Sequence, residues 1–253
     1  MVNKLIIAIS GVSGAGKDQM ADILGARHNC CKIALADKMK QILFDVIGFS
    51  KQQLFGPSKF RNIPDEKLFT YEPFKSIYEE EDYKTFLMLD GKFPNELTEE
   101  ELNSELAKGK RKYLIPRDGL LKLGQAGKDF YIHFWVDYTL RAISQILNEG
   151  YWYDQTCGTW SESISEGGSS NYSGAVIPDL RFISEIERVK EHGAKIVRIK
   201  RNNLPPNLVS GNHPSETEQL TLPDSYFDYV IENNGTLEDL YAEVEKMFTA
   251  LNS

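Results

Sequence analysis

The chain begins with a continuous apolar run over residues 5–9 that lacks the alternation of a half-exposed strand. Such a run predicts a strand covered on both faces, as in a parallel sheet. A glycine-rich turn follows it, and over 18–28 the apolar residues return at helical spacing. This order of strand, glycine loop and helix predicts the opening of a βαβ unit.

The alternation of strands and helices recurs along the chain. Further apolar runs of strand length lie at 32–36, 174–177, 195–199 and 229–231. Apolar residues at helical spacing follow four of the five runs, over 18–28, 37–47, 183–193 and 237–248. Strands that alternate with helices predict an α/β fold, with a mostly parallel sheet and helices on both of its faces.

The middle of the chain has a different pattern. Residues 50–115 carry runs of charge and little strand signal, and Thr98 and Glu101 at capping-box spacing predict a helix over 98–107. Residues 118–148 are expected to be helical, with a break near Gly124 or Gly127. We interpret residues 1–253 as one domain with helical insertions, in which 62–112 is an insertion and the Gly-, Ser- and aromatic-rich 150–173 is a long loop.

Composition narrows the class of protein. Lys and Arg number 29 against 37 Asp and Glu, and the net charge of −8 has the wrong sign for a protein that wraps a nucleic-acid backbone. A small phosphorylated ligand stays compatible, because a few local cations and N–H groups suffice to bind it. The three cysteines have neither disulfide-framework nor zinc-site spacing, and no apolar run reaches about 18 residues. We therefore expect a soluble cytoplasmic protein that binds neither nucleic-acid polymers nor membranes.

The most specific motif is residues 11–18, Gly-Val-Ser-Gly-Ala-Gly-Lys-Asp, which fits G-x-x-x-x-G-K between the first predicted strand and helix. The glycines let backbone N–H groups point at a phosphate near the positive end of the helix. The lysine reaches the β- and γ-phosphates as a point charge. The motif predicts a site for a nucleoside triphosphate made by Gly11, Ser13, Gly14, Ala15, Gly16, Lys17 and Asp18.

One position of this motif departs from the consensus. Asp18 stands where a serine or threonine normally offers its hydroxyl to Mg²⁺. A carboxylate is also a hard oxygen ligand, although it adds negative charge beside a polyanion. Asp18 is thus either a metal ligand, directly or through water, or a cap of the helix.

A second candidate group follows the apolar run at 174–177. Asp179 comes just after this run, at the edge of a parallel sheet where ligands bind. Asp179 is predicted to organise magnesium-bound water, and Arg181 to hold a transferring phosphoryl group. The alternative for the pair is a helix-capping aspartate and a surface arginine.

Five separated pieces of the chain together resemble the deoxynucleoside monophosphate kinases of tailed bacteriophages, a branch of the P-loop nucleoside monophosphate kinase fold. The pieces are 11–18 with its aspartate, 36–40, 116–124, 178–181 and the C-terminal stretch from 213–216 to 233–237. The resemblance implies a three-layer P-loop kinase fold. It also implies ATP- and Mg²⁺-dependent phosphorylation of a deoxynucleoside monophosphate to the diphosphate, for DNA precursor synthesis in a host cytoplasm. Residues 62–112 and 150–173 match nothing in the family, and 62–112 is either an insertion or an acceptor-side subdomain.

The acceptor needs cations of its own, and three residues are candidates for its site. Arg117 begins a predicted helix, and a guanidinium binds a monophosphate bidentately. Asp37 and Lys40 open the second predicted helix, close to the phosphate loop. The alternatives are a surface arginine and a solvated helix start.

The remaining candidates lie toward the C-terminus. Arg201 follows the apolar run at 195–199 and begins a lid-like segment, 201–222, where a lid arginine completes a cationic cage on closure. His213 and Glu216 in that segment are expected to touch the nucleotide. The family places Asn233 and Asn234 in a loop beside adenine, and the alternative is a turn before a capped helix.

Other functions fit part of the same pattern. One is a P-loop kinase for another small acceptor, such as dephospho-coenzyme A, and another is a non-catalytic nucleotide-binding module in which Asp18 weakens magnesium binding. A nucleic-acid end kinase is disfavoured by the acidic balance. The accepted bases, the discrimination of deoxyribose from ribose and the oligomeric state, including a homodimer, stay open at this point.

Overall fold

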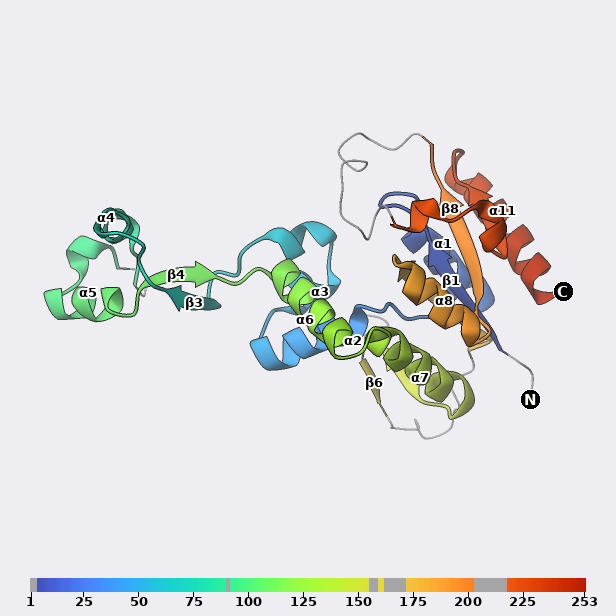
Figure 1. Ribbon diagram of the computed structural model, residues 1–253, viewed down its shortest axis with the longest axis horizontal. Coiled ribbons are helices and arrows are strands. Elements are labelled where there is room, and N and C mark those ends of the chain that lie inside the picture. Colours follow the sequence, from blue (N-terminus) through green and yellow to red (C-terminus); the bar gives the residue numbers. More distant parts are fainter. Residues whose placement is uncertain (1–3, 90–91, 155–158, 162–171, 203–217) are drawn as a thin grey trace. The chain divides into compact units, whose positions relative to one another are not determined.

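A computed structural model describes residues 4–89, 92–154, 159–161, 172–202 and 218–253 (Figure 1). The chain divides into two compact units. We call Met1–Ile42 with Lys122–Ser253 the sheet unit, and Leu43–Leu121 the inserted unit. The phosphate-loop motif belongs to the sheet unit.

Five parallel strands form the centre of the sheet unit. Their order across the sheet is β2-β7-β1-β8-β9, so that β1, which leads into the glycine motif, is the middle strand. The strands are β1 (Leu5–Ser10), β2 (Cys30–Lys32), β7 (Gly174–Leu180), β8 (Lys195–Lys200) and β9 (Tyr229–Glu232). Because all five are parallel, their carboxyl ends share one edge, where a ligand site is expected.

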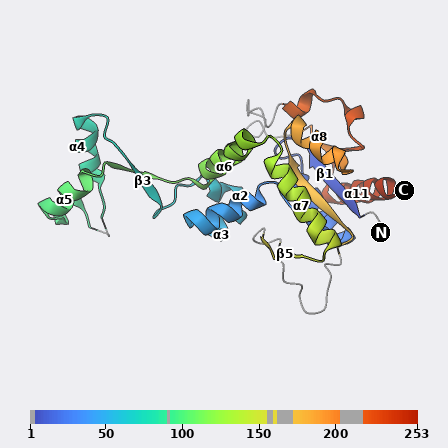
Figure 2. The same ribbon diagram turned by 60° about the horizontal axis from the view of Figure 1, so that its bottom comes forward.

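Helices cover both faces of this sheet (Figures 1 and 2). On one face, Ile7 and Ile9 of β1 share a buried cluster with α1 (Lys17–His28) and α11 (Leu237–Asn252). On the other face, Ala8 packs with α7 (Phe134–Asn148) and α8 (Ile183–Glu191). Unbroken apolar runs arise because successive side chains of each strand enter different buried layers. The predicted three-layer α/β arrangement is confirmed.

Helix ends in the sheet unit follow the predicted signals. Thr236 caps α11 by accepting from the backbone N–H of Asp239, whose carboxylate accepts from the Thr236 N–H in return. After α8 the chain turns at Gly193, which has a φ of +79°. The first turn of α11 and the last turn of α8 thus have partners for backbone groups that a helix end leaves unpaired.

The strand predicted over 32–36 is wrong in its position, because β2 covers only Cys30–Lys32. Ile33 N–H still donates to Val176 O of β7 at 2.9 Å, and the next two backbone N–H groups find side-chain partners. Ala34 N–H donates to Asp37 Oδ2 at 2.9 Å, and Leu35 N–H donates to Asp179 Oδ1 at 3.0 Å. These two carboxylates end the strand and form the loop that enters α2 (Asp37–Ile42).

The helix break predicted near Gly124 or Gly127 is also wrong in its position. Both glycines lie inside α6 (Pro116–Phe130), and the break falls at residues 131–133, before α7. The Trp135 indole packs against this part of α6, and its Nε1–H donates to Gly124 O at 3.0 Å. A Cβ at Gly127 would lie 2.4 Å from the same Nε1. Gly127 therefore makes room for the indole, Gly124 offers it a backbone acceptor, and neither glycine ends the helix.

The inserted unit contains short helices and an antiparallel pair of strands. Its elements are η1 (Leu43–Ile47), α3 (Lys51–Phe55), η2 (Ser58–Asn62), β3 (Phe69–Glu72), α4 (Ile77–Phe86), η3 (Pro94–Glu96), α5 (Glu99–Leu106) and β4 (Lys110–Tyr113). The helix predicted over 98–107 is α5, with Thr98 as its capping residue. Buried Glu105 accepts from Arg111 Nε at 2.6 Å and from the Tyr71 hydroxyl, and so joins α5 to both β3 and β4.

The predicted long loop 150–173 contains two short strands, β5 (Trp152–Asp154) and β6 (Thr159–Ser161), which pair antiparallel. The remaining short helices are η4 (Glu218–Thr221) and η5 (Asp224–Tyr226). Among the residues that the structure describes, none of the helices combines the length and the apolar character that crossing a membrane requires.

Candidate active site

The glycine motif forms a tight loop between β1 and α1. Gly14 and Gly16 have φ values of +78° and +107°, a backbone conformation that residues with a Cβ rarely adopt. Gly11 has a different reason, since a Cβ there would lie 2.5 Å from the backbone oxygen of Ile199 in β8. The predicted glycine loop is confirmed, with a physical requirement for glycine at each of these three positions.

Lys17 is the first residue of α1, and its side chain folds back over the loop. The ammonium Nζ donates to Gly11 O at 2.5 Å and to Val12 O at 2.8 Å. The Lys17 charge is therefore held at the loop itself, where a phosphate group would compete with two neutral carbonyls. The hydrogen bonds to the carbonyls are already charge-assisted through the ammonium donor, and a phosphate would add the attraction between opposite charges.

Asp18 is exposed, with 87% of its side chain accessible, and it faces Lys32 at 3.6 Å. Lys32 also pairs with Asp22 one helical turn later, at 2.8 Å. The N-cap of α1 is Gly16, so Asp18 lies within the first turn and does not occupy the N-cap position. Sequence reasoning missed Lys32 because the strand that it ends was predicted to begin there.

Asp37, Lys40 and Asp179 lie in one cluster at the carboxyl end of β7. Asp179 accepts from Leu35 N–H, while Asp37 accepts from Ala34 N–H and pairs with Lys40 Nζ at 2.8 Å. The pKa of Asp179 is raised to about 6, because burial and the charge of Asp37 raise it more than the hydrogen bond from Leu35 N–H lowers it. The structure thus places Asp37 and Lys40, two candidates for the acceptor site, next to Asp179, which was predicted to organise magnesium-bound water.

Asp179→Asn should stabilise the folded protein at neutral and alkaline pH. The folded-state pKa of Asp179, about 6, exceeds the unfolded value of about 3.9, so its favourable contribution below pH 4 is lost as the pH rises through 6. Above that pH the ionised side chain costs about 2–3 kcal/mol. The amide of asparagine keeps an acceptor for Leu35 N–H and carries no charge.

The check for this variant is urea denaturation in metal-free buffer near pH 4.5 and near pH 8. The free energy of unfolding of the variant should exceed that of the wild type by about 2 kcal/mol near pH 8, and the difference should fall to about a third of that near pH 4.5. Asp22→Asn is the matched control, because that side chain is 68% exposed. An equal difference at both pH values would contradict the assignment of the cost to Asp179 ionisation.

Arg181 follows β7 at the first turn toward α8. Its backbone N–H and that of Phe182 both donate to Glu185 Oε2, at 3.0 and 3.2 Å. The other oxygen of Glu185 pairs with Lys128 Nζ at 3.0 Å, and this lysine also lies 3.4 Å from the centre of the Phe182 ring. Buried Glu185 therefore fixes the backbone that carries Arg181, a role that the sequence did not indicate.

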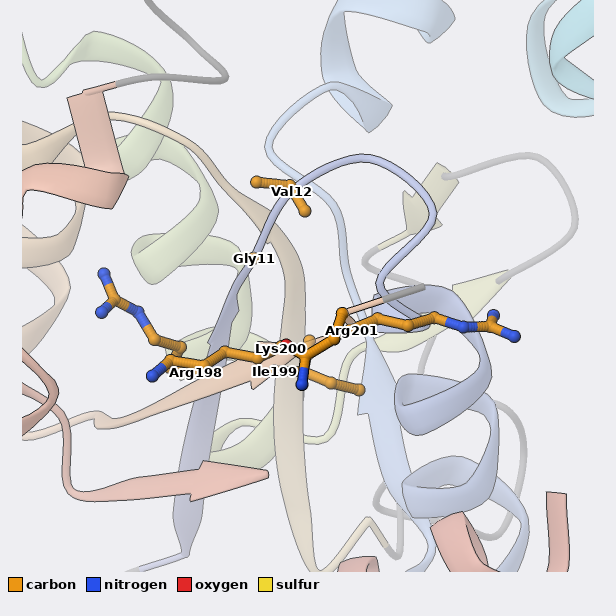
Figure 3. A pocket seen from close by; sticks show the side chains of 7 residues that line it. Gly11, Val12, Arg198, Ile199, Lys200 and Arg201 are labelled. Atoms are coloured by element: carbon orange, nitrogen blue, oxygen red, sulfur yellow. The ribbon is translucent and has the colours of Figure 1, made fainter. Parts of the chain in front are cut away.

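Arg201 lies at the rim of a cavity of about 310 Å³ next to the phosphate loop (Figure 3). Gly11 and Val12 line it from the loop, and residues 198–202 line it from the end of β8. Arg198 and Arg201 extend in opposite directions in Figure 3. Buried Arg198 binds Leu222 O and Asp224 Oδ1 at 2.9 and 3.0 Å, a structural role, whereas Arg201 is exposed.

The two asparagines after β9 contact different segments. Asn233 Nδ2 donates to Ala15 O in the phosphate loop at 2.8 Å, and Asn233 N–H donates to Lys200 O at 2.7 Å. Asn234 Oδ1 accepts from the N–H of Asn202 at 2.7 Å. Asn233 therefore contacts the glycine loop and the end of β8, and Asn234 contacts the residue that follows Arg201. The place beside adenine that the resemblance implies for the two residues stays a prediction.

Three predicted site residues lie outside the described part of the sheet unit. Arg117 belongs to the inserted unit, where its Nε donates to Asn62 Oδ1 at 2.5 Å. His213 and Glu216 lie outside the described residues. Their roles, and that of Arg117, stay predictions.

The central parallel sheet, the helices on both faces and the glycine loop between β1 and α1 are consistent with the P-loop kinase fold. Comparison with known proteins narrows this class. The family model for deoxynucleotide monophosphate kinase matches residues 142–244, a range that includes Asp179, Arg201 and Asn233.

Two viral proteins are similar to the chain over nearly its whole length. The deoxynucleotide monophosphate kinase of Escherichia phage RB69 is 25% identical over 266 residues, which cover 96% of this chain and 98% of that protein. A protein of Acanthamoeba polyphaga mimivirus, provisionally named a deoxynucleotide monophosphate kinase, is 22% identical over 241 residues, covering 95% and 94%. These matches confirm the resemblance seen in the motifs, and they support a nucleotide kinase.

Proposed function

We propose that the protein transfers the γ-phosphoryl group of ATP to a deoxynucleoside 5′-monophosphate and forms the diphosphate, a step of DNA precursor synthesis in a host cytoplasm. The observation that carries this proposal is the Lys17 ammonium held at the carbonyls of a glycine loop, at the carboxyl edge of a parallel sheet. The similarity to two viral proteins with deoxynucleotide monophosphate kinase names supports this acceptor.

Positioning and charge neutralisation are the main requirements of phosphoryl transfer. The N–H groups of the loop and the Lys17 ammonium bind the phosphates of ATP. Arg201, exposed at the rim of the loop cavity, and Arg181, whose backbone Glu185 fixes, neutralise the transferring group. These cations act without a protein nucleophile, because the acceptor supplies the attacking phosphate oxygen.

Magnesium is the cofactor that this chemistry implies, and the chain has oxygen donors of the kind that it prefers. Within the described residues, no three His, Cys, Asp or Glu side chains form a metal cluster. Such a cluster is unnecessary, since Mg²⁺ in kinases is commonly held by one or two carboxylates together with substrate phosphates. Asp18 and Asp179 are the carboxylates that would hold it, and the ion would neutralise charge on the β- and γ-phosphates.

Three further residues are proposed to bind the acceptor. Arg117 clamps the monophosphate, and Asp37 and Lys40 bound the site from α2. His213 and Glu216 are proposed to contact the nucleotide. An arginine clamp suits this acceptor, because a guanidinium matches the geometry of a phosphate with two parallel hydrogen bonds.

One assay tests the proposed function against its alternatives. The purified chain is incubated with Mg-ATP and, separately, each deoxynucleoside monophosphate, each ribonucleotide, dephospho-coenzyme A and shikimate, while ADP release is followed. ADP release with deoxynucleotides is expected. Release with dephospho-coenzyme A alone would indicate the other small-acceptor kinase, and ATP binding without turnover of any acceptor would indicate a nucleotide-binding module.

Arg117→Ala should chiefly raise KM for the acceptor, by about ten-fold or more, because it removes a bidentate cation from the monophosphate. The KM for ATP should change little. Steady-state kinetics with the best deoxynucleotide measures both constants. Arg141→Ala, which removes an exposed arginine of α7, is the matched control. An unchanged acceptor KM in the Arg117 variant would show that the clamp is assigned to the wrong residue.

A further inference from the structure

Asn233 joins three segments that lie far apart in the sequence. It follows β9, and only 8% of its surface is accessible. Its backbone N–H donates to Lys200 O at the end of β8, and its side-chain Nδ2 donates to Ala15 O, 218 residues earlier in the chain. A buried side-chain hydrogen bond to a backbone carbonyl constrains the direction of that carbonyl.

The carbonyl held by Asn233 belongs to the same peptide unit as the N–H of Gly16. Because a trans peptide unit is planar, its C=O and N–H point in opposite directions. Holding Ala15 O toward Asn233 therefore directs the Gly16 N–H away from Asn233. In a phosphate loop, the backbone N–H groups are the donors that bind the phosphate.

Gly16 itself is packed against the same amide. A Cβ at Gly16 would lie 2.5 Å from Asn233 Nδ2, and the φ of +107° also disfavours any side chain there. Asn233 thus occupies the space next to Gly16 while it binds the preceding carbonyl. The loop conformation and the position of Asn233 depend on each other.

We propose that Asn233 is a positioning residue for phosphate binding, which orients the Ala15–Gly16 peptide unit, and that it makes no contact with the adenine base. This inference rests on the phosphate-binding part of the proposed function. Asn234 differs, because its side chain binds the Asn202 N–H and not the loop. The contact with adenine that the family resemblance implies is therefore not assigned to Asn233.

The test compares ligands with and without a base. Isothermal titration calorimetry measures the affinity of the full chain for tripolyphosphate and for ATP, in the wild type, in Asn233→Ala and in Asn233→Asp. Asn233→Ala should lower the affinity for both ligands by the same factor, about ten-fold, because one buried hydrogen bond is lost. Asn233→Asp conserves the size of the side chain but replaces the donor by an anion that faces a carbonyl. It should lower the affinity for both ligands at least as much as Asn233→Ala does.

Two controls separate this role from general destabilisation. Ile231→Val thins the buried core two residues before Asn233, and Asn148→Ala makes the same chemical change at the end of α7. Both should retain the affinity for tripolyphosphate within about two-fold. Circular dichroism and thermal unfolding establish that each variant is folded, and Asn233→Asp keeps the test decisive if the alanine variant does not fold.

Two results would overturn the proposal. One is an unchanged affinity for tripolyphosphate with a weakened affinity for ATP, which would make Asn233 a contact of the nucleoside. The other is an equal loss in Ile231→Val, which would make the effect one of stability alone. A wild-type chain that binds tripolyphosphate but phosphorylates no deoxynucleotide would refute the proposed function and leave this test intact.

Discussion

Lys17→Ala is expected to reduce turnover to background, a loss of about a thousand-fold or more, while the protein stays folded. The ammonium is held by Gly11 O and Val12 O, so that its charge lies at the loop that we propose to bind the phosphates. Charge on the transferring phosphoryl group must be neutralised in the transition state. Alanine removes that charge and keeps the helix-forming character of the position at the start of α1.

The measurement is ADP release with the best deoxynucleotide acceptor at saturating Mg-ATP, together with the thermal midpoint of unfolding. Lys246→Ala is the matched control, since that lysine is 66% exposed on α11 and pairs with Glu243. It should retain wild-type kcat. If Lys17→Ala kept more than about a tenth of the wild-type kcat, the role of this lysine in catalysis would have to be abandoned.

Gly11→Ala is expected to lower both phosphate binding and stability. The new Cβ would lie 2.5 Å from Ile199 O and 3.0 Å from Ile199 Cγ2, so that the start of the loop and the end of β8 must move apart. Overpacking of this kind costs about 1–3 kcal/mol of folding free energy. A shift of about 1 Å in the loop lowers kcat/KM about a hundred-fold.

Gly25→Ala is the control for this substitution, because it makes the same change inside α1, where the Cβ would have an ordinary 3.5 Å contact with Cys30 O. It should raise the free energy of unfolding by about 0.5–1 kcal/mol and leave the kinetics unchanged. Urea denaturation and steady-state kinetics distinguish the two variants. Equal kinetics for both would mean that the close approach of Gly11 to β8 has no part in the site.

Much of the central fold could be predicted from the sequence, because burial of a strand on both faces leaves a local mark. The apolar run at 5–9 corresponds to β1, and those at 174–177 and 195–199 correspond to β7 and β8. Helix starts were equally local, since the capping residues Thr98 and Thr236 lie three residues from their partners. Each of these signals lies within a short stretch of chain.

The predictions that were wrong depended on contacts between separate elements of the fold. The end of β2 is decided by Asp179, which binds Leu35 N–H across 144 residues. Gly124 and Gly127 of α6 look like helix breakers until Trp135 is placed beside them. Neither contact leaves a periodic pattern in the sequence, because a hydrogen bond to a distant partner needs only one residue at each end.

By itself, the sequence determined the phosphate loop, because all of its chemistry lies in the eight consecutive residues 11–18. Only the tertiary structure decided which distant groups accompany that loop. Lys32 faces Asp18. The carboxylates of Asp37 and Asp179 accept from the neighbouring N–H groups of Ala34 and Leu35, and Asn233 binds Ala15 O. The physical reason is the order of the strands: parallel pairing brings the ends of β7, β8 and β9 to one edge, although their residues are far apart along the chain.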